Sequence, residues 1–189
     1  MNTLFVSRLH AWNLLFSFIL GCAWASSALS QSYIGFDNIY VDAPIYDVDG
    51  KTLLAGPAFA AQLYVALPGK SLEPLGSPSS FSTERPGFFG AQTFLVPGMG
   101  AGDYILAQVA AWRVSDGSTF EAANRPGGHV GASSVFSVGP LTGGLQPPTV
   151  LEGLQSFSLQ VVVPEPSVFA LGLLGGLALV LGRRRGRFR

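Results

Sequence analysis

Residues able to carry out acid–base or nucleophilic chemistry are few in the central part of this 189-residue sequence. Between residues 26 and 160, His129 is the only histidine. A catalytic triad, a histidine-based zinc site or a general base would each need further groups beside this imidazole, and none completes such a set. The preceding Pro126-Gly127-Gly128 is typical of a surface loop, so we interpret His129 as a solitary, exposed side chain.

Carboxylates are the second class of candidate catalytic residues. Glu73 with Glu84, or Glu121 with Glu152, could in principle form the acid and base pair of a glycosidase. The acidic residues are scattered along the chain, and most acidic side chains of a protein are simply exposed to solvent. We therefore predict no catalytic residue and a protein that is not an enzyme. An extracellular hydrolase remains a third alternative.

The segment Asp47-Val48-Asp49-Gly50 could offer carboxylates to Ca²⁺. The complete calcium-loop pattern is missing, because no bidentate glutamate follows at the required distance. An Asp-Gly pair between apolar runs is more typical of a hairpin turn, which is the interpretation we adopt. The sequence thus predicts no metal site and no cofactor.

Aromatic side chains supply a possible binding site. Phe88-Phe89 is flanked by glycines, and in an exposed loop this pair could contact the sugar rings of a polysaccharide. Trp112 lies in a long apolar run instead, where packing in the core is the default. Phe88 and Phe89 are therefore the predicted sugar contacts.

Short strands must position all of these residues. Clusters of Gly, Pro and Ser separate runs rich in β-branched and aromatic residues, which predict strands at residues 34–41, 59–67, 92–96, 103–114, 134–138 and 154–163. The run at 103–114 is largely apolar on both alternating faces, as in a central strand. The pattern predicts an all-β fold, a single Ig-like or jelly-roll-like β-sandwich over residues 26–160.

The formal net charge of zero conceals an acidic middle and a basic end. Residues 26–164 contain five basic and ten acidic side chains, a net charge of −5, and five of the remaining six basic residues follow Gly182. An acidic body argues against nucleic acid as a partner, because phosphate binding needs clustered Lys and Arg. The same region has no cysteine, which excludes disulfides and thiolate metal ligands there.

Residues 1–25 have the three parts of a secretory signal peptide: a basic start, a short apolar stretch and a terminal Ala-Trp-Ala. We predict that signal peptidase cuts between Ala25 and Ser26, with a cut before Gln31 as the second candidate. Ile19-Leu20-Gly21-Cys22 is similar to a lipobox, so lipidation of Cys22 stays open as an alternative.

The last part of the chain, residues 161–189, also has three ordered parts: Val163-Pro164-Glu165-Pro166-Ser167, an apolar stretch, and a basic end at 183–189 that begins with Arg183, Arg184 and Arg185. Fifteen apolar residues rise only ~22 Å as a helix, short of the ~30 Å hydrocarbon core. Interfacial residues and snorkelling arginines extend that reach. We predict a transmembrane helix at 167–182 with its arginines in the cytoplasm.

This order of motif, apolar span and arginine cluster resembles the PEP-CTERM sorting signal of exported proteins from Gram-negative, biofilm-forming bacteria. The resemblance implies recognition by the exosortase, a membrane-embedded cysteine protease that cuts near the Pro-Glu-Pro and lets the body reach the cell surface or the exopolysaccharide matrix. Segments of the body, among them Gly35-Phe36-Asp37-Asn38, are similar to uncharacterised proteins with such tails, which implies a shared β-domain.

The sequence therefore predicts an exported, non-enzymatic component of the cell surface or biofilm matrix, anchored transiently in the inner membrane. Its predicted partners are signal peptidase, the exosortase-type protease and the membrane, and extracellular polysaccharide is a further candidate. The alternative function is a carbohydrate-binding module. Whether the body is released or remains anchored is left open by the residues themselves.

Overall fold

A computed structural model describes residues 31–164 of the chain. The predicted signal peptide, its cleavage site at Ala25 and Ser26, motif residues 165–167, the span 167–182 and Arg183–Arg185 lie outside the described residues. Within 31–164 the protein is all-β, with one helical turn, α2 (Phe120–Ala123). No helix in that range is long and apolar enough to cross a membrane.

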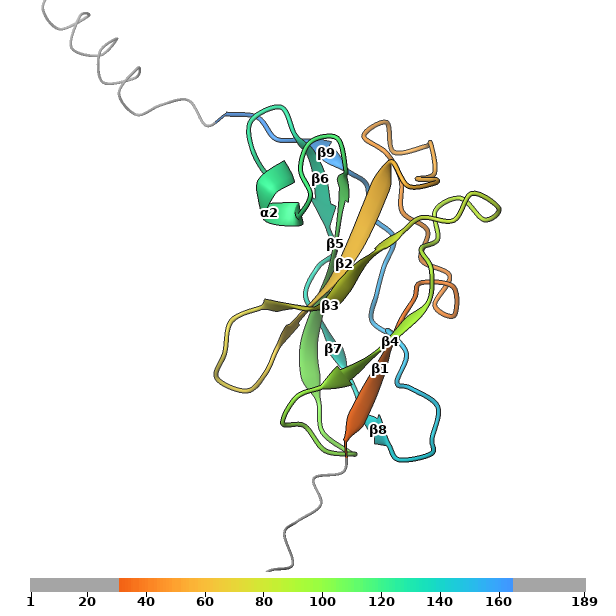
Figure 1. The fold of residues 1–189 in the computed structure, drawn as a ribbon, viewed down its shortest axis with the longest axis vertical. Helices are drawn as coiled ribbons and strands as arrows, with labels where there is room; N and C mark the ends of the chain where they lie inside the picture. Colours follow the sequence, from red (N-terminus) through yellow and green to blue (C-terminus); the bar gives the residue numbers. More distant parts are fainter. Residues whose placement is uncertain (1–30, 165–189) are drawn as a thin grey trace, which may run out of the picture.

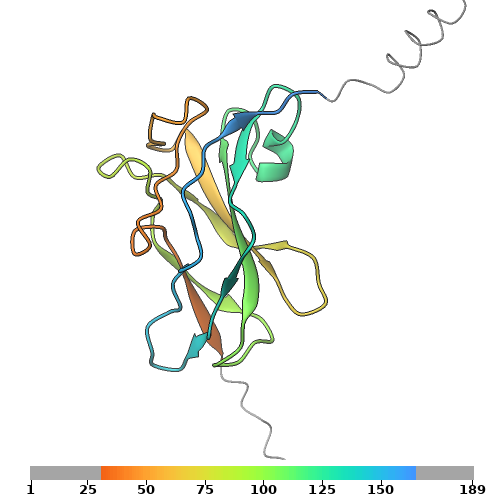
Figure 2. The ribbon, with the colours of Figure 1, turned by 180° about the vertical axis from the view of Figure 1, so that it is seen from behind.

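The strands form two antiparallel sheets that face each other, an arrangement consistent with a β-sandwich (Figure 1 and, from behind, Figure 2). The three-stranded sheet has the order β4 (Gln92–Val96), β1 (Ser32–Phe36), β8 (Thr142–Gly143). The larger sheet has the order β3 (Glu73–Ser80), β2 (Phe59–Ala66), β5 (Ile105–Arg113), β6 (His129–Ala132), β9 (Gln160–Val161), and β7 (Phe136–Val138) also pairs with β5.

β5 is the central strand, as its two apolar faces predict. It pairs with β2 from Leu106 to Arg113 and, on its other side, with β6 and β7 in turn. The sequence missed β3 because Pro74, Gly76 and Pro78 break the usual strand pattern. β3 is an edge strand, where prolines are tolerated because one side needs no amide donor.

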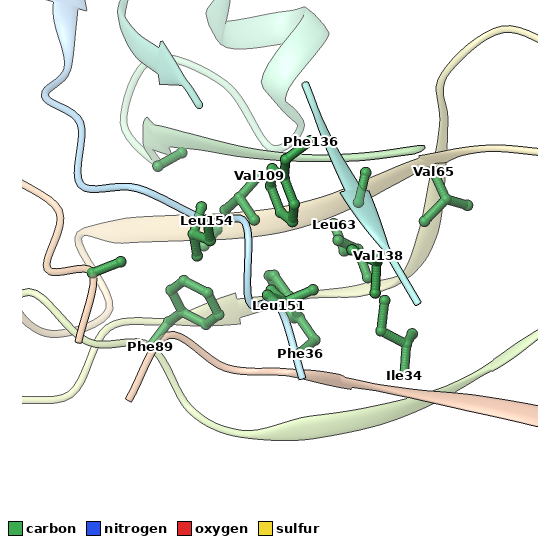
Figure 3. Packing of buried hydrophobic residues seen from close by; sticks show 14 of the residues in the cluster. Ile34, Phe36, Leu63, Val65, Phe89, Val109, Phe136, Val138, Leu151 and Leu154 are labelled. Carbon is green, nitrogen blue, oxygen red and sulfur yellow. The ribbon is translucent and has the colours of Figure 1, made fainter. Parts of the chain in front are cut away.

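The main core lies between the two sheets (Figure 3). β1 contributes Ile34 and Phe36, and the larger sheet contributes Leu63 and Val109 from its inner face. The connection after β8 adds Leu151, which is fully buried. The predicted strand at 34–41 ends already at Phe36, because Asp37 accepts a hydrogen bond from the Ile39 amide and turns the chain.

The predicted exposure of Phe88 and Phe89 is wrong. Phe88 is 7% and Phe89 1% exposed, and Figure 3 shows the Phe89 ring inside the core. The ring centroid of Phe89 lies 4.5 Å from that of Phe36, and the backbone N of Phe89 donates to Asn38 Oδ1 over 3.1 Å. The loop folds inward because Asn38, 51 residues away, supplies its polar partner. These two phenylalanines therefore present no aromatic face to a sugar.

The Asp47–Gly50 segment is a tight turn, as the hairpin interpretation predicts. Tyr46 and Leu53 pair across it, and Gly50 has a positive φ of 66°. Asp49 Oδ1 accepts bonds from the Lys51 and Thr52 amides, so the carboxylate closes the turn itself. These bonds fold the Asp49 carboxylate back onto its own backbone.

Candidate functional site

The described part of the predicted sorting motif begins where the chain leaves the larger sheet. Val162 N donates to Gly128 O over 2.9 Å, and Gly127 N donates to Val162 O over 2.8 Å. Val163, the next residue, is 76% exposed, and Pro164 is exposed too. β9 ends at Val161, Val162 is still bonded to the backbone of the loop before β6, and the predicted motif starts at Val163. We call this point, between Val162 and Val163, the exit of the chain.

Two glycines allow this exit to form. Gly127 has a φ of +84°, a conformation that favours glycine. A Cβ at Gly128 would lie 1.9 Å from the carbonyl oxygen of Ala123, so no other residue fits there. The sequence pattern that indicated a loop in fact places the backbone close enough to hold Val162.

His129 was predicted to be an exposed, solitary loop residue, and both parts of that prediction are wrong. It starts β6, and its side chain is 23% exposed. Its Nδ1 lies 2.7 Å from Asp116 Oδ2, and its backbone N donates to the same oxygen over 2.8 Å. Asp116 follows the end of β5, so sequence separation hid this pair. The contact ties β6, and through it β9, to the β5–α2 connection.

The Asp116 carboxyl has opposing influences on its pKa. Burial raises it, while the hydrogen bonds from the His129 ring and amide lower it, and the net pKa is below the ordinary value. No serine or threonine hydroxyl within residues 31–164 is hydrogen-bonded to His129. The imidazole–carboxylate pair is therefore built as a structural clamp.

The helical turn α2 covers the outer face of the larger sheet beside the exit. Thr119 caps it by accepting from Ala122 N over 3.2 Å. The Phe120 ring packs edge-on against Trp112 and Tyr64, with centroids 6.5 Å and 6.0 Å away. Trp112 is 1% exposed, as predicted. It does not lie between the two sheets, however, but packs in a second apolar cluster with Ala60, Ala123 and Val130.

A hydrogen bond from Tyr64 to Glu121 Oε1 fixes α2 to β2. Burial and the Glu121 contact both raise the pKa of Tyr64, and the same bond lowers the pKa of Glu121. The Glu121 carboxylate, a predicted candidate for a glycosidase acid or base, is thus already hydrogen-bonded to Tyr64. Its predicted companion Glu152 lies in the connection before β9, and Glu73 and Glu84 lie on β3 and in the loop after it, all exposed.

No hydrogen bond joins any two of these four glutamates in the described part of the chain. Residues 31–164 also contain no cluster of three or more His, Cys, Asp or Glu side chains that could hold a metal ion.

A groove of about 670 Å³ runs beside the exit. Its lining includes Phe120 of α2, Val130 of β6, the polar residues Asn124, Ser158 and Gln160, and Val161 to Val163. The described residues of the predicted sorting motif therefore begin beside a groove of mixed polar and apolar lining.

A smaller hollow at the opposite end of β5 was not predicted from the sequence. Its volume is about 240 Å³, and Leu67, Lys70, Tyr104, Leu106 and Ser137 are among the residues that line it. The sequence places Tyr104 within the predicted strand at 103–114 and assigns it no further role. Its 60% exposure is visible only once β5 is placed in the sheet.

No protein-family model, curated protein or solved structure matches this chain.

Proposed function

We propose that this chain is an exported, non-enzymatic component of the cell surface or exopolysaccharide matrix. Signal peptidase would remove residues 1–25, and an exosortase-type protease of the inner membrane would recognise the tail at 161–189. In this proposal the span 167–182 and Arg183–Arg185 hold the protein transiently in the membrane. Cleavage near Pro164-Glu165-Pro166 then gives the body access to the matrix.

The observation that carries the proposal is that Val162 is the last of the described residues whose backbone is hydrogen-bonded to the body. A protease needs an extended strip that it can reach, and Val163 and Pro164 are both exposed. Proline has no amide donor and disfavours a helical conformation in the residue before it. The arrangement supports a folded body that can be cut from its tail without unfolding.

For the body, we propose a single β-sandwich of the Ig-like or jelly-roll-like kind. Two antiparallel sheets share one apolar core, which is the basic feature of such folds. Residues 31–164 contain no cysteine, so burial of this core replaces disulfides as the source of stability outside the cell. A stable scaffold with an exposed end suits a protein that is displayed or deposited.

The intact mass of the protein recovered from culture matrix tests the proposal. We expect a species that begins at Ser26 and ends between Pro164 and Ser167. Glu165→Ala should stay in the membrane fraction and retain Arg189. Glu152→Ala, which changes an exposed glutamate of the body, is the matched control and should be processed normally. Matrix protein that still carries Arg189, or a lipid on Cys22, would overturn the proposal.

A further inference from the structure

We propose that the hollow beside Tyr104 binds a pyranose unit of an extracellular glycan, with the sugar ring stacked on the tyrosine. This inference goes beyond the proposed function, because it assigns a ligand to the body and not a route of export.

The first argument is that the Tyr104 ring is both exposed and held in place. The residue is 60% exposed. A Cβ on Gly139 would lie 2.7 Å from Tyr104 Cδ1 and 3.0 Å from Cγ, so the ring rests against the bare backbone of that glycine. An aromatic ring supported on one side and open on the other is a rigid platform, which loses little conformational freedom when a flat ligand stacks on it.

The second argument is the chemistry around the ring. Leu106 is two residues along β5, on the same face, and is 49% exposed. Ser137 stands directly opposite Leu106 in the register, and Lys70 also lines the hollow; both residues are exposed. Apolar atoms for the C–H face of a sugar thus stand beside a hydroxyl and an ammonium that can bond its oxygens.

The third argument is size. The hollow measures about 240 Å³, below the roughly 300–1,000 Å³ of pockets that enclose a whole drug-sized ligand. It therefore suits one ring of a longer chain that continues over the surface. Nine residues line it, whereas a standard protein interface uses roughly 20–30 residues from each partner. A sugar unit fits these dimensions better than a second protein.

The position of the hollow agrees with this use. Tyr104 immediately precedes β5, whose first residues lie at the end of the molecule where β1 begins (Figure 1). Trp112 is close to the other end of β5, which lies toward β6 and β9. Eight residues of strand separate them by ~26 Å. A body tethered through its tail would present this hollow away from the tether. Lys70 is the sole ionisable lining residue besides the Tyr104 phenol, so either hydroxyls or a single carboxylate of the sugar could be its partner.

The test is calorimetric titration of the full chain, purified in a polyoxyethylene detergent because that headgroup contains no sugar. The probes are cellohexaose, a neutral glycan, and a galacturonic acid hexamer, which carries carboxylates. We expect saturable binding of at least one probe. Tyr104→Ala should weaken it at least tenfold, and Tyr104→Phe, which keeps the ring, should change it less than threefold.

Tyr40→Ala is the matched control, because Tyr40 is 80% exposed yet lies outside the hollow. It should bind like the wild type. Lys70→Met distinguishes the ligand classes: a loss confined to the galacturonate probe indicates a carboxylate partner, and an equal loss for both probes indicates hydroxyl partners. The site is refuted if the wild type binds neither probe, or if Tyr104→Ala binds as well as the wild type. This result is independent of the intact-mass experiment, which tests sorting and not sugar binding.

Discussion

At the scale of single residues, Asn38 holds the loop that contains Phe88 and Phe89, the two residues wrongly predicted to be exposed. It is fully buried, and its Nδ2 donates to Ala43 O over 2.8 Å and to Gly87 O over 2.9 Å. Its Oδ1 accepts from Phe89 N. One side chain thus satisfies three backbone groups in two loops, and this is why Phe88 and Phe89 turn inward.

Replacing Asn38 by Ala should therefore destabilise the fold strongly. Ala43 O and Phe89 N would be left without a partner, whereas Gly87 O would keep the bond from Ile45 N. Each unsatisfied buried group costs about 1–3 kcal/mol. We expect the free energy of unfolding to fall by about 3 kcal/mol or more, measured by urea denaturation. Asn124→Ala, at an exposed asparagine, should change it by less than about 0.5 kcal/mol. Equal small effects from both variants would contradict the assigned role of Asn38.

The Asp116–His129 clamp predicts a pH-dependent effect. Because the folded pKa of Asp116 is lowered, its contribution is present above the unfolded pKa of about 3.9 and is lost as pH falls through the folded value. Asp116→Asn should cost about 1 kcal/mol at pH 7, and its difference from the wild type should shrink below about pH 4. Thermal unfolding across pH 3–8 measures this, with exposed Glu152→Gln as the control. A difference that is constant with pH would exclude the clamp.

At the scale of elements, β3 and β4, which are edge strands of the two different sheets, are in contact with each other. Gly76 has a φ of +72°, and a Cβ there would lie 2.1 Å from Phe94 Cε1. The β4 phenylalanine therefore packs directly on the β3 backbone. This contact explains why β3 contains a glycine in its interior. The two prolines of β3 have a different reason, since they are tolerated because β3 is an edge strand.

Gly76→Ala should accordingly cost more than conformational strain alone. Gly69 offers a matched control, because its φ is +75° and nothing lies within 4 Å of its added Cβ. We expect Gly69→Ala to cost about 1 kcal/mol from strain, and Gly76→Ala about 3 kcal/mol because the Phe94 ring must move. Chemical denaturation of both variants gives the two values. Equal losses would mean that Phe94 yields without cost.

At the scale of the whole molecule, the segment at 157–159, which leads into β9, connects distant parts of the fold. Leu159 is 1% exposed, its N donates to Tyr46 O over 2.9 Å, and Tyr46 N donates to Phe157 O over 3.0 Å. The segment just before the exit thus joins the core to the β1–β2 connection. Val163 and Pro164, the last two described residues, are exposed, so we expect the predicted sorting tail to add little to the stability of the body.

A pair of truncations tests this expectation. A chain ending at Pro164 should unfold cooperatively with the same Tm as the full chain. A chain ending at Ser156 loses the buried Leu159, the Tyr46 contacts and β9, and its Tm should fall by more than about 10 °C. Differential scanning calorimetry gives both values. If removal of residues 165–189 alone lowered the Tm by that much, the tail would be part of the fold.

The sequence by itself determined the features that depend on local pattern. Alternation and turn residues predicted the all-β class, the central position of β5 and the tight turn at Asp47 to Gly50, because each follows from the properties of neighbouring residues. The predictions for the two end segments, with the Pro164-Glu165-Pro166 motif, likewise rest on linear patterns of neighbouring residues.

Only the tertiary structure decided which residues meet across long separations. The Phe89–Asn38 bond, the His129–Asp116 clamp and the Tyr104 ring on Gly139 span 51, 13 and 35 positions respectively. A flanking glycine suggests a loop but does not reveal whether that loop turns toward the core or the solvent. Burial and partners depend on sheet register, which is set by the whole set of strand pairings and not by any one segment.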